Sequence, residues 1–337
     1  MRAYEVGPQS GLDSLRLVER DAPKPGFGEV AVKVHAACLN HRDLLTLKGE
    51  YGPTKAENRI PLSDGIGSVI ALGDNVEGIS TGQRVVAPNF VTWIKGEFTP
   101  AIYAQDLGIS RDGWLAETII LPADAVLAVP ENVTDDAAAT IAVAGSTIWH
   151  CMVSFGGLKK DDLVLTLGTG GVSILTLQVA KALGAQVAIT SSSDYKLDRC
   201  KNMGADFCIN YSDDDDWAAA LMAATGGRGA NIVVDTAGLN SIEQSIAACA
   251  SNGRIAMIGA LSGKPQMAPQ MAGIIGKNLT LKGITAGSRA MLCDVVDLVA
   301  RESIEPLIDR KFTFDEAPAA FAYLESGDHI GKVMITL

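Results

Sequence analysis

A glycine-rich turn at residues 168–171 constrains the fold of this chain more than any other feature. The five residues before it, Leu163-Val-Leu-Thr-Leu167, form an apolar run of the length of a buried strand. After it, apolar residues recur at helical spacing as far as Gly184. The pattern predicts a strand, a tight turn and a helix. At such a turn a pyrophosphate can approach the backbone, and the amides and dipole of the helix start supply its counter-charge.

The turn departs from the pattern Gly-x-Gly-x-x-Gly at one position, where Ser173 replaces the third glycine. That glycine allows close packing of the helix on the strand, and serine is still a small residue. Taken alone, the motif fits either a dinucleotide site or an ordinary glycine-rich turn of an α/β protein.

The residues after the turn favour the dinucleotide site. A second helix is predicted over 196–203, and five more strands over 186–190, 207–210, 231–235, 254–259 and 279–284. Six strands with helical segments between most of them are typical of a doubly wound parallel sheet, the fold that binds dinucleotides at the carboxyl ends of its strands.

Composition limits the class of protein. The chain has 337 residues and a net charge of −11, which argues against nucleic acid or an anionic membrane as a partner. Six scattered cysteines without a Cys-x-x-Cys pair are expected to be reduced. We find no leader-like start and no uninterrupted apolar stretch of about 18 residues, so we expect a cytoplasmic protein.

The nucleotide-binding unit fills only the middle of the chain. Residues 1–128 contain short alternating segments separated by glycine and proline turns, which predicts a β-rich domain. Two helical stretches, 290–301 and 315–326, precede a closing strand at 332–337, and this strand most simply returns to the β-rich domain. We therefore predict a discontinuous domain of residues 1–128 and 287–337, a second domain of residues 129–286, and a cleft between them.

Several strings, in this order, resemble the medium-chain dehydrogenase/reductase superfamily, which contains zinc alcohol dehydrogenases and zinc-free quinone reductases. Besides the glycine turn they are residues 25–30, 40–43, 61–67, 82–86, 113–117 and 331–332. The resemblance covers essentially the whole chain. It implies a GroES-like β-rich catalytic domain followed by a Rossmann domain.

The zinc ligands of the superfamily have no good counterparts in this chain. The matching positions are Asn40, Ser63 and Val143, or Ala144 if the alignment shifts by one. No cysteine cluster follows residues 83–89, where a structural zinc would be bound. Each of the four histidines is expected to be solvent-facing or hydrogen-bonded instead of a ligand. We therefore predict no metal.

The same resemblance implies which residues handle the negative charge that develops during hydride transfer. Asn40 and Tyr51 match positions that lie close to the nicotinamide and the substrate carbonyl in zinc-free quinone reductases. Both side chains can donate hydrogen bonds to an oxyanion. In the alternative interpretation, Asn40 satisfies local backbone groups and Tyr51 lines a loop.

The source of the proton is left open by the sequence. Arg42 stands where zinc alcohol dehydrogenases carry a relay serine or threonine, so water, His41 or Tyr51 remain as donors. We expect Arg42 and Asp43 to form an orienting ion pair. Asp64 matches an acid that supports the site, and a purely structural role fits it equally well.

The second strand predicts the choice of cofactor. NAD specificity usually requires an acid about 20 residues after the turn, and this chain has serines there. The residues expected around a 2′-phosphate are Ser191, Ser192, Ser193 and Lys196, and the resemblance adds Tyr211, which matches a position that touches this phosphate in related quinone reductases. We predict NADPH; if the nearby Asp194 points inward, the preference relaxes toward NADH.

The remaining cofactor contacts follow from the fold and the resemblance. The turn residues expected to bind the pyrophosphate are Gly168, Thr169, Gly170, Gly171 and Val172. Those expected at the nicotinamide end are Ala237, Gly259, Ala260 and Leu261. Lys332 is expected to reach the pyrophosphate, or else to be a solvated terminal lysine.

Together these features predict an NADPH-dependent, zinc-free oxidoreductase that passes hydride to a quinone, an activated alkene or a carbonyl. Alcohol dehydrogenation is the alternative reaction, and a catalytically idle NADPH-binding protein is the alternative of another class. By analogy with the superfamily, the strand at 279–284 is expected to pair two subunits into a homodimer or a dimer of dimers.

Overall fold

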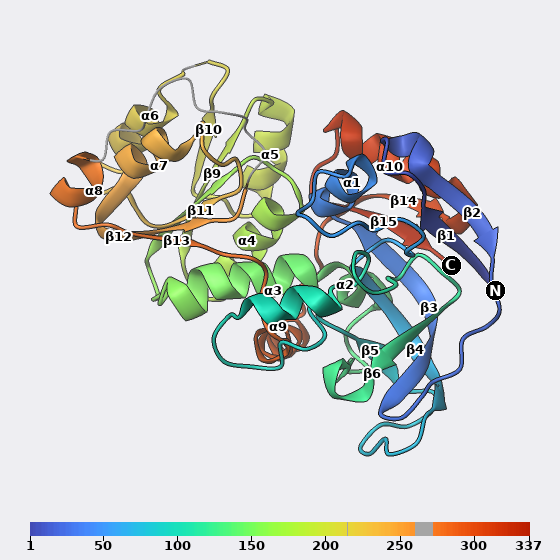
Figure 1. The fold of residues 1–337 in the computed structure, drawn as a ribbon. Helices are drawn as coiled ribbons and strands as arrows, with labels where there is room; N and C mark the ends of the chain where they lie inside the picture. The colour runs from blue at the N-terminus through green and yellow to red at the C-terminus, as the bar shows by residue number, and fades with distance from the viewer. Residues whose placement is uncertain (214, 260–271) are drawn as a thin grey trace. The chain divides into compact units, whose positions relative to one another are not determined.

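In a computed structural model, the described residues are 1–213, 215–259 and 272–337. They form two compact units. Unit 1 contains Met1–Ser146 and Gly287–Leu337, and unit 2 contains Thr147–Ala286. Both ends of the chain belong to unit 1 (Figure 1). Ala260 and Leu261, two of the expected cofactor contacts, lie outside the described residues.

The first boundary between the units differs from the one predicted. It lies between residues 146 and 147 instead of after residue 128, whereas the second lies between 286 and 287. Helix α2 (Asp135–Thr140) packs against strands β3 (Glu29–Leu39) and β4 (Asp64–Leu72) of unit 1. The backbone N–H of Val143 donates to Asp64 Oδ1 at 2.7 Å. These contacts place residues 129–146 in unit 1.

Unit 2 is built on a six-stranded parallel sheet in the order β10-β9-β8-β11-β12-β13. Its strands are β8 (Leu163–Leu167), β9 (Gln186–Ser191), β10 (Phe207–Asn210), β11 (Ala230–Asp235), β12 (Cys249–Met257) and β13 (Thr280–Gly283). This order, with its reversal between β8 and β11, confirms the predicted doubly wound Rossmann fold. Strand β12 begins at Cys249, five residues before the expected strand at 254–259.

Helices cover both faces of this sheet. All five residues of β8 are buried, and successive side chains of a strand point to opposite faces, so neither face of β8 is open. Helix α4 packs on β8 and β9, and α7 packs on β11 and β12. The helices of unit 2 are α4 (Gly171–Ala182), α5 (Asp194–Asn202), α6 (Trp217–Ala224), α7 (Ile242–Ala248) and α8 (Ala272–Gly276).

Unit 1 is rich in β-structure, as predicted for the GroES-like domain. Its strands are β1 (Arg2–Val6), β2 (Leu15–Glu19), β3 (Glu29–Leu39), β4 (Asp64–Leu72), β5 (Arg84–Val86), β6 (Thr118–Pro122), β7 (Leu127–Ala128), β14 (Ile308–Thr313) and β15 (Lys332–Thr336). Seven form the sheet order β14-β15-β3-β4-β5-β7, with β6 also paired to β3, while β1 pairs with β2. The closing strand β15 runs antiparallel to β3, so its predicted return to this domain is confirmed.

The helices of unit 1 come from distant parts of the chain. They are α1 (His41–Lys48), α2, α9 (Arg289–Glu302) and α10 (Ala317–Ser326). Helix α3 (Val143–Trp149) runs across the boundary between the units. Among the described residues, none of the helices has the length and apolar character needed to cross a membrane.

Candidate active site

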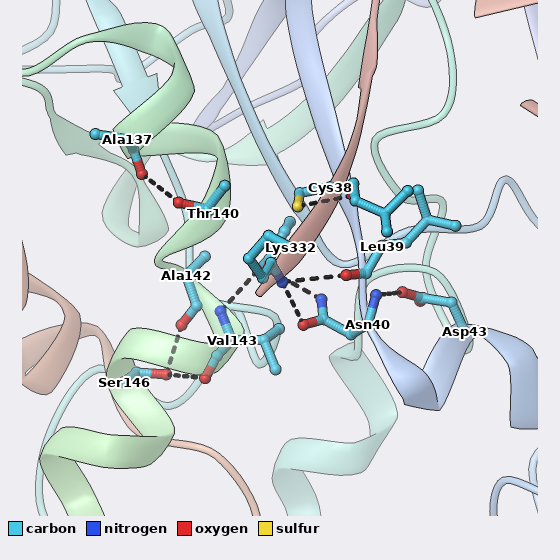
Figure 2. A network of polar contacts seen from close by, with 12 residues as sticks. Cys38, Leu39, Asn40, Asp43, Ala137, Thr140, Ala142, Val143, Ser146 and Lys332 are labelled. Atoms are coloured by element: carbon cyan, nitrogen blue, oxygen red, sulfur yellow. Dashed lines mark hydrogen bonds and ion pairs between the residues drawn. The ribbon is translucent and has the colours of Figure 1, made fainter. Parts of the chain in front are cut away.

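A buried ammonium group lies at the centre of a polar network in unit 1. Lys332 Nζ donates to Asn40 Oδ1 at 2.7 Å, to the Leu39 carbonyl at 3.1 Å and to Asp64 Oδ2 at 3.1 Å. Figure 2 shows the lysine pointing toward the Asn40 amide and the Leu39 carbonyl. The alternative of a solvated terminal lysine is therefore wrong, because Lys332 is only 3% exposed.

The charges of this network stabilise one another. Burial by itself lowers the pKa of Lys332. Cys38 and Asp64 beside it raise the pKa by more than burial lowers it, so the net shift is upward. The amine is therefore an ammonium at neutral pH. Asp64 is fully buried and would be an uncompensated charge without this partner. The predicted contact of Lys332 with a pyrophosphate stays a prediction.

The network fixes the orientation of the Asn40 amide. An ammonium can only donate hydrogen bonds, so the atom facing Lys332 must be the amide oxygen. Asn40 Nδ2 then donates to Asp64 Oδ2 at 2.9 Å. The second hydrogen of Nδ2 has no acceptor among the residues that the structure describes, so it is available to another group.

Asp43 supports Asn40 from the first turn of α1. The Asn40 backbone N–H donates to Asp43 Oδ2 at 2.7 Å, so the carboxylate closes the start of the helix. Burial raises the pKa of Asp43 to about 7, although the nearby Arg42 and the bond from Asn40 act in the opposite direction. Its role is to hold the backbone of Asn40.

The expected Arg42–Asp43 ion pair is wrong. The guanidinium of Arg42 donates to Asp106 Oδ2 at 2.7 Å, and both side chains are more than nine-tenths buried. Neighbouring residues of a helix point in different directions, so Asp43 turns back to the helix start while Arg42 leaves on another side. The sequence offered no local signal for this pair, because its partners are 64 positions apart.

The same arginine holds Tyr51. The Arg42 guanidinium carbon lies 4.8 Å from the centre of the Tyr51 ring, which is a cation–π distance. Burial raises the pKa of the Tyr51 hydroxyl, which outweighs the lowering effect of Arg42. Tyr51 therefore keeps its proton at neutral pH and can act as a hydrogen-bond donor.

Two of the three positions that match zinc ligands bind Asp64. Asn40 and the backbone of Val143 both donate to its carboxylate, and Ser63 precedes it in the chain. The described residues contain no group of three or more His, Cys, Asp or Glu side chains that could hold a metal ion. The residues present do not fit zinc, because an amide, a hydroxyl and an alkyl chain replace the ligands and an ammonium lies beside them.

In unit 2 the glycine turn has the geometry of an anion site. Gly168 has a φ of 74°, in the left-handed region that favours glycine. Gly170 precedes α4 without a side-chain cap, and an added Cβ at Gly168 or Gly170 would meet nothing within 4 Å. Backbone amides at the start of α4 are therefore open to a phosphate. Thr169, Gly171 and Val172 complete the turn, with Thr169 buried.

The residues expected around a 2′-phosphate gather at the ends of β9 and β10. Ser191 Oγ accepts from the N–H of Ser193 at 3.2 Å, and Ser193 Oγ caps α5 through the N–H of Lys196 at 3.4 Å. The backbone of Tyr211 donates to the Ser191 carbonyl at 3.0 Å. Ser192 and Tyr211 are exposed. The end of β9 thus carries the three serines 191–193, where NAD-specific enzymes usually have an acidic residue.

Asp194, which complicates the choice of cofactor, has a partner of its own. Its Oδ1 accepts from Asn210 Nδ2 at 2.7 Å, at the end of β10. The Asp194 carboxylate is therefore held at the end of β10, and its negative charge remains close to residues 191–193.

The loop after β11 is held by a buried carboxylate. Asp235 Oδ1 accepts from the N–H groups of Ala237 at 3.1 Å and Gly238 at 2.9 Å. Gly259 approaches so closely that an added Cβ would lie 1.8 Å from the Thr236 carbonyl oxygen. Ala237 and Gly259, both expected at the nicotinamide end, are therefore adjacent.

Family models match most of the chain. Residues 26–131 match the alcohol dehydrogenase GroES-like domain, and residues 171–301 match the zinc-binding dehydrogenase family. A zinc-type alcohol dehydrogenase-like protein of Schizosaccharomyces pombe is 38% identical over 97% of this chain and 96% of its own length. The chain belongs to the medium-chain dehydrogenase/reductase superfamily. It is an NAD(P)-dependent oxidoreductase of that superfamily.

Several solved structures are similar to this chain over its whole length, and so over both units. An NAD-dependent alcohol dehydrogenase is 32% identical, with a TM-score of 0.90 over 100% of both chains. Two mycobacterial structures, one complexed with NADPH and the other a quinone oxidoreductase, are 28% and 27% identical with TM-scores of 0.83 and 0.81 over 100% of both chains. The structures similar to this medium-chain dehydrogenase/reductase therefore include an NAD-dependent enzyme and a complex with NADPH.

Proposed function

We propose that this protein reduces a quinone, an activated alkene or a carbonyl compound with NADPH, without zinc. The observation that carries the proposal is the Asn40 amide, whose oxygen is held by the buried Lys332 ammonium and whose Nδ2 keeps one hydrogen for an acceptor. An amide fixed in this way is suited to bind developing negative charge on a substrate oxygen.

The chemistry divides between cofactor and protein. Bound NADPH would supply a hydride to a carbon of the substrate, so that negative charge would develop on the substrate oxygen. Asn40 Nδ2–H donates to that oxygen, and Tyr51 is the second donor. The oxygen, or the α-carbon of an enolate, then takes a proton from water, His41 or Tyr51.

The cofactor is proposed to bind through backbone groups of the glycine turn and through hydroxyls and charge at the end of β9. Gly168, Thr169, Gly170, Gly171 and Val172 would hold the pyrophosphate. Ser191, Ser192, Ser193, Lys196 and Tyr211 would hold the 2′-phosphate. Ala237 and Gly259 would hold the nicotinamide end. One similar structure is an NAD-dependent enzyme, so NADH is the alternative cofactor.

The preference for NADPH is tested at Lys196. Lys196→Glu is expected to lower the ratio of kcat/KM for NADPH to that for NADH by roughly tenfold to a hundredfold, since a charge-assisted hydrogen bond contributes about 1.5–3 kcal/mol. Lys201→Glu, a change of the same charge on the same helix, is the control and leaves the ratio near its original value. An unchanged ratio in Lys196→Glu would contradict the assignment.

The reaction class is tested by one screen. Consumption of NADPH is followed at its nicotinamide absorbance with quinones, enones and aldehydes in turn, and with alcohols plus NADP⁺ in the reverse direction. We expect reduction in at least one of the first three classes. Activity with alcohols alone would favour the dehydrogenase alternative, and NADPH binding without turnover would favour a non-catalytic binding protein.

The assembly and location that accompany this function are also proposals. Strand β13 forms one edge of the parallel sheet, and its pairing with a second copy would give a cytoplasmic homodimer or a dimer of dimers. Light scattering that reports a monomer at assay concentration would contradict this assembly.

A further inference from the structure

Two hydroxyl groups meet at one backbone carbonyl in unit 2. Ser173 Oγ donates to the Leu167 carbonyl oxygen at 2.7 Å, and Thr236 Oγ1 donates to the same atom at 2.7 Å. A carbonyl oxygen has two lone pairs, so it can accept both bonds. Leu167 is the last residue of β8 and immediately precedes the glycine turn.

Ser173 connects the two ends of the turn. It lies in the first turn of α4, is only 2% exposed, and binds back to the strand that the turn has just left. A glycine at this position of the pattern would lack that bond. Polar contacts contribute to holding the turn, because the Gly168 N–H also donates to Thr190 Oγ1 at 3.3 Å. The bond from Ser173 is the one that joins the two ends of the turn.

Thr236 connects the turn to the neighbouring loop. It follows β11, and the adjacent Asp235 fixes the N–H groups of Ala237 and Gly238. The Gly259 N–H in turn donates to the Asp235 carbonyl at 3.1 Å. Through Thr236, the end of β8 is thus linked to the loop after β11 and to the end of β12.

We propose that Ser173, Thr236 and the Leu167 carbonyl form a brace that holds the glycine turn and the loop after β11 in one arrangement. Ser173 and Thr236 are positioning residues: they act on the cofactor through the backbone that they connect. The brace couples binding of the pyrophosphate at the turn to binding of the nicotinamide end at the loop. This inference rests on the proposed binding of NADPH. It assigns a positioning role to the hydroxyl of Ser173, in addition to the small size that lets the helix pack closely on the strand.

The test measures binding directly by calorimetry, with NADPH and with adenosine 2′,5′-bisphosphate, which lacks the nicotinamide half. Ser173→Ala and Ser173→Gly are each expected to weaken NADPH binding by about fivefold, the effect of one hydrogen bond. Both are expected to weaken the shorter ligand as well, because its 5′-phosphate reaches the turn. If Ser173→Gly binds NADPH as well as the unmodified protein, only small size matters and the brace is overturned.

Thr236→Val is expected to weaken NADPH by about fivefold and to weaken adenosine 2′,5′-bisphosphate as well, because its bond acts on the carbonyl that precedes the turn; Thr236→Ser, which keeps the hydroxyl, restores the binding of both. Because the two bonds act on one carbonyl, the Ser173→Ala/Thr236→Val double variant loses less than the product of the single losses. An effect of Thr236→Val on NADPH alone, or losses that multiply in the double variant, would overturn the coupling.

The control is Thr225→Val, which removes a similar hydroxyl-to-carbonyl bond, to Leu221, at the end of α6. It should leave the NADPH dissociation constant unchanged, which would show that the loss of a hydroxyl bonded to a carbonyl is not by itself the cause. The brace and the proposed function fail differently. If the unmodified protein does not bind NADPH, the function is wrong; if all variants bind it equally, only the brace is wrong.

Discussion

Replacing Asn40 with alanine is expected to lower kcat/KM for NADPH-dependent reduction by about 10²–10³-fold, the usual effect of removing one donor to an oxyanion. The amide is fixed by Lys332 and Asp64, so no other group moves easily into its place. Because its nitrogen serves the substrate and not the cofactor, the dissociation constant of NADPH should stay within about twofold.

The matched control for this variant is Asn132→Ala. Asn132 is an exposed asparagine of unit 1 whose Nδ2 donates to the Ala300 carbonyl, so the same atoms are removed away from the network. Its kcat/KM should equal that of the unmodified protein. If Asn40→Ala keeps full activity, Asn40 only satisfies its surroundings, and the oxyanion role is wrong.

Replacing Lys332 with methionine is expected to lower the free energy of unfolding by about 3–5 kcal/mol, because it leaves the fully buried carboxylate of Asp64 without its positive partner. Urea denaturation at neutral pH measures this loss. The Lys332→Met/Asp64→Asn double variant should regain part of it, since the second change removes the stranded charge.

Lys311→Met provides the comparison for that experiment. Lys311 pairs with Asp136 at the surface, where its side chain is 47% exposed, and such pairs contribute about 1 kcal/mol or less. Equal losses in Lys311→Met and Lys332→Met would show that the Asp64 carboxylate does not depend on the ammonium.

The local features of the fold were predictable from the sequence. The strand before Gly168 and the helix after it follow from the change of apolar spacing at the turn, and β10 has the predicted bounds 207–210. The return of β15 to the first domain was predicted from a tail expected to be helical, although that tail also contains β14, which pairs with β15. Such predictions use either residues that are close together in the sequence or the order in which helices and strands follow one another.

The contacts that define the site were not predictable in the same way. Lys332 lies 292 positions from Asn40 and Arg42 lies 64 positions from Asp106. Such pairs form only when strands and loops distant in sequence come together, and neither residue carries a local pattern that names its partner. The sequence therefore predicted Asn40 and Tyr51 through a resemblance, but gave the wrong partner for Arg42 and missed the ammonium that orients the Asn40 amide.

Hydride transfer from NADPH without zinc can be followed by isotope transfer with metal-depleted protein. The protein is treated with a chelator, its zinc content is measured, and NADPH that carries deuterium at both C4 positions is supplied with a substrate identified in the screen. We predict that deuterium appears on the reduced carbon of an enone or aldehyde product, or that a quinone is reduced with a primary kinetic isotope effect, and that the rate matches that of untreated protein. Loss of turnover on chelation, with recovery on addition of zinc, would contradict the account.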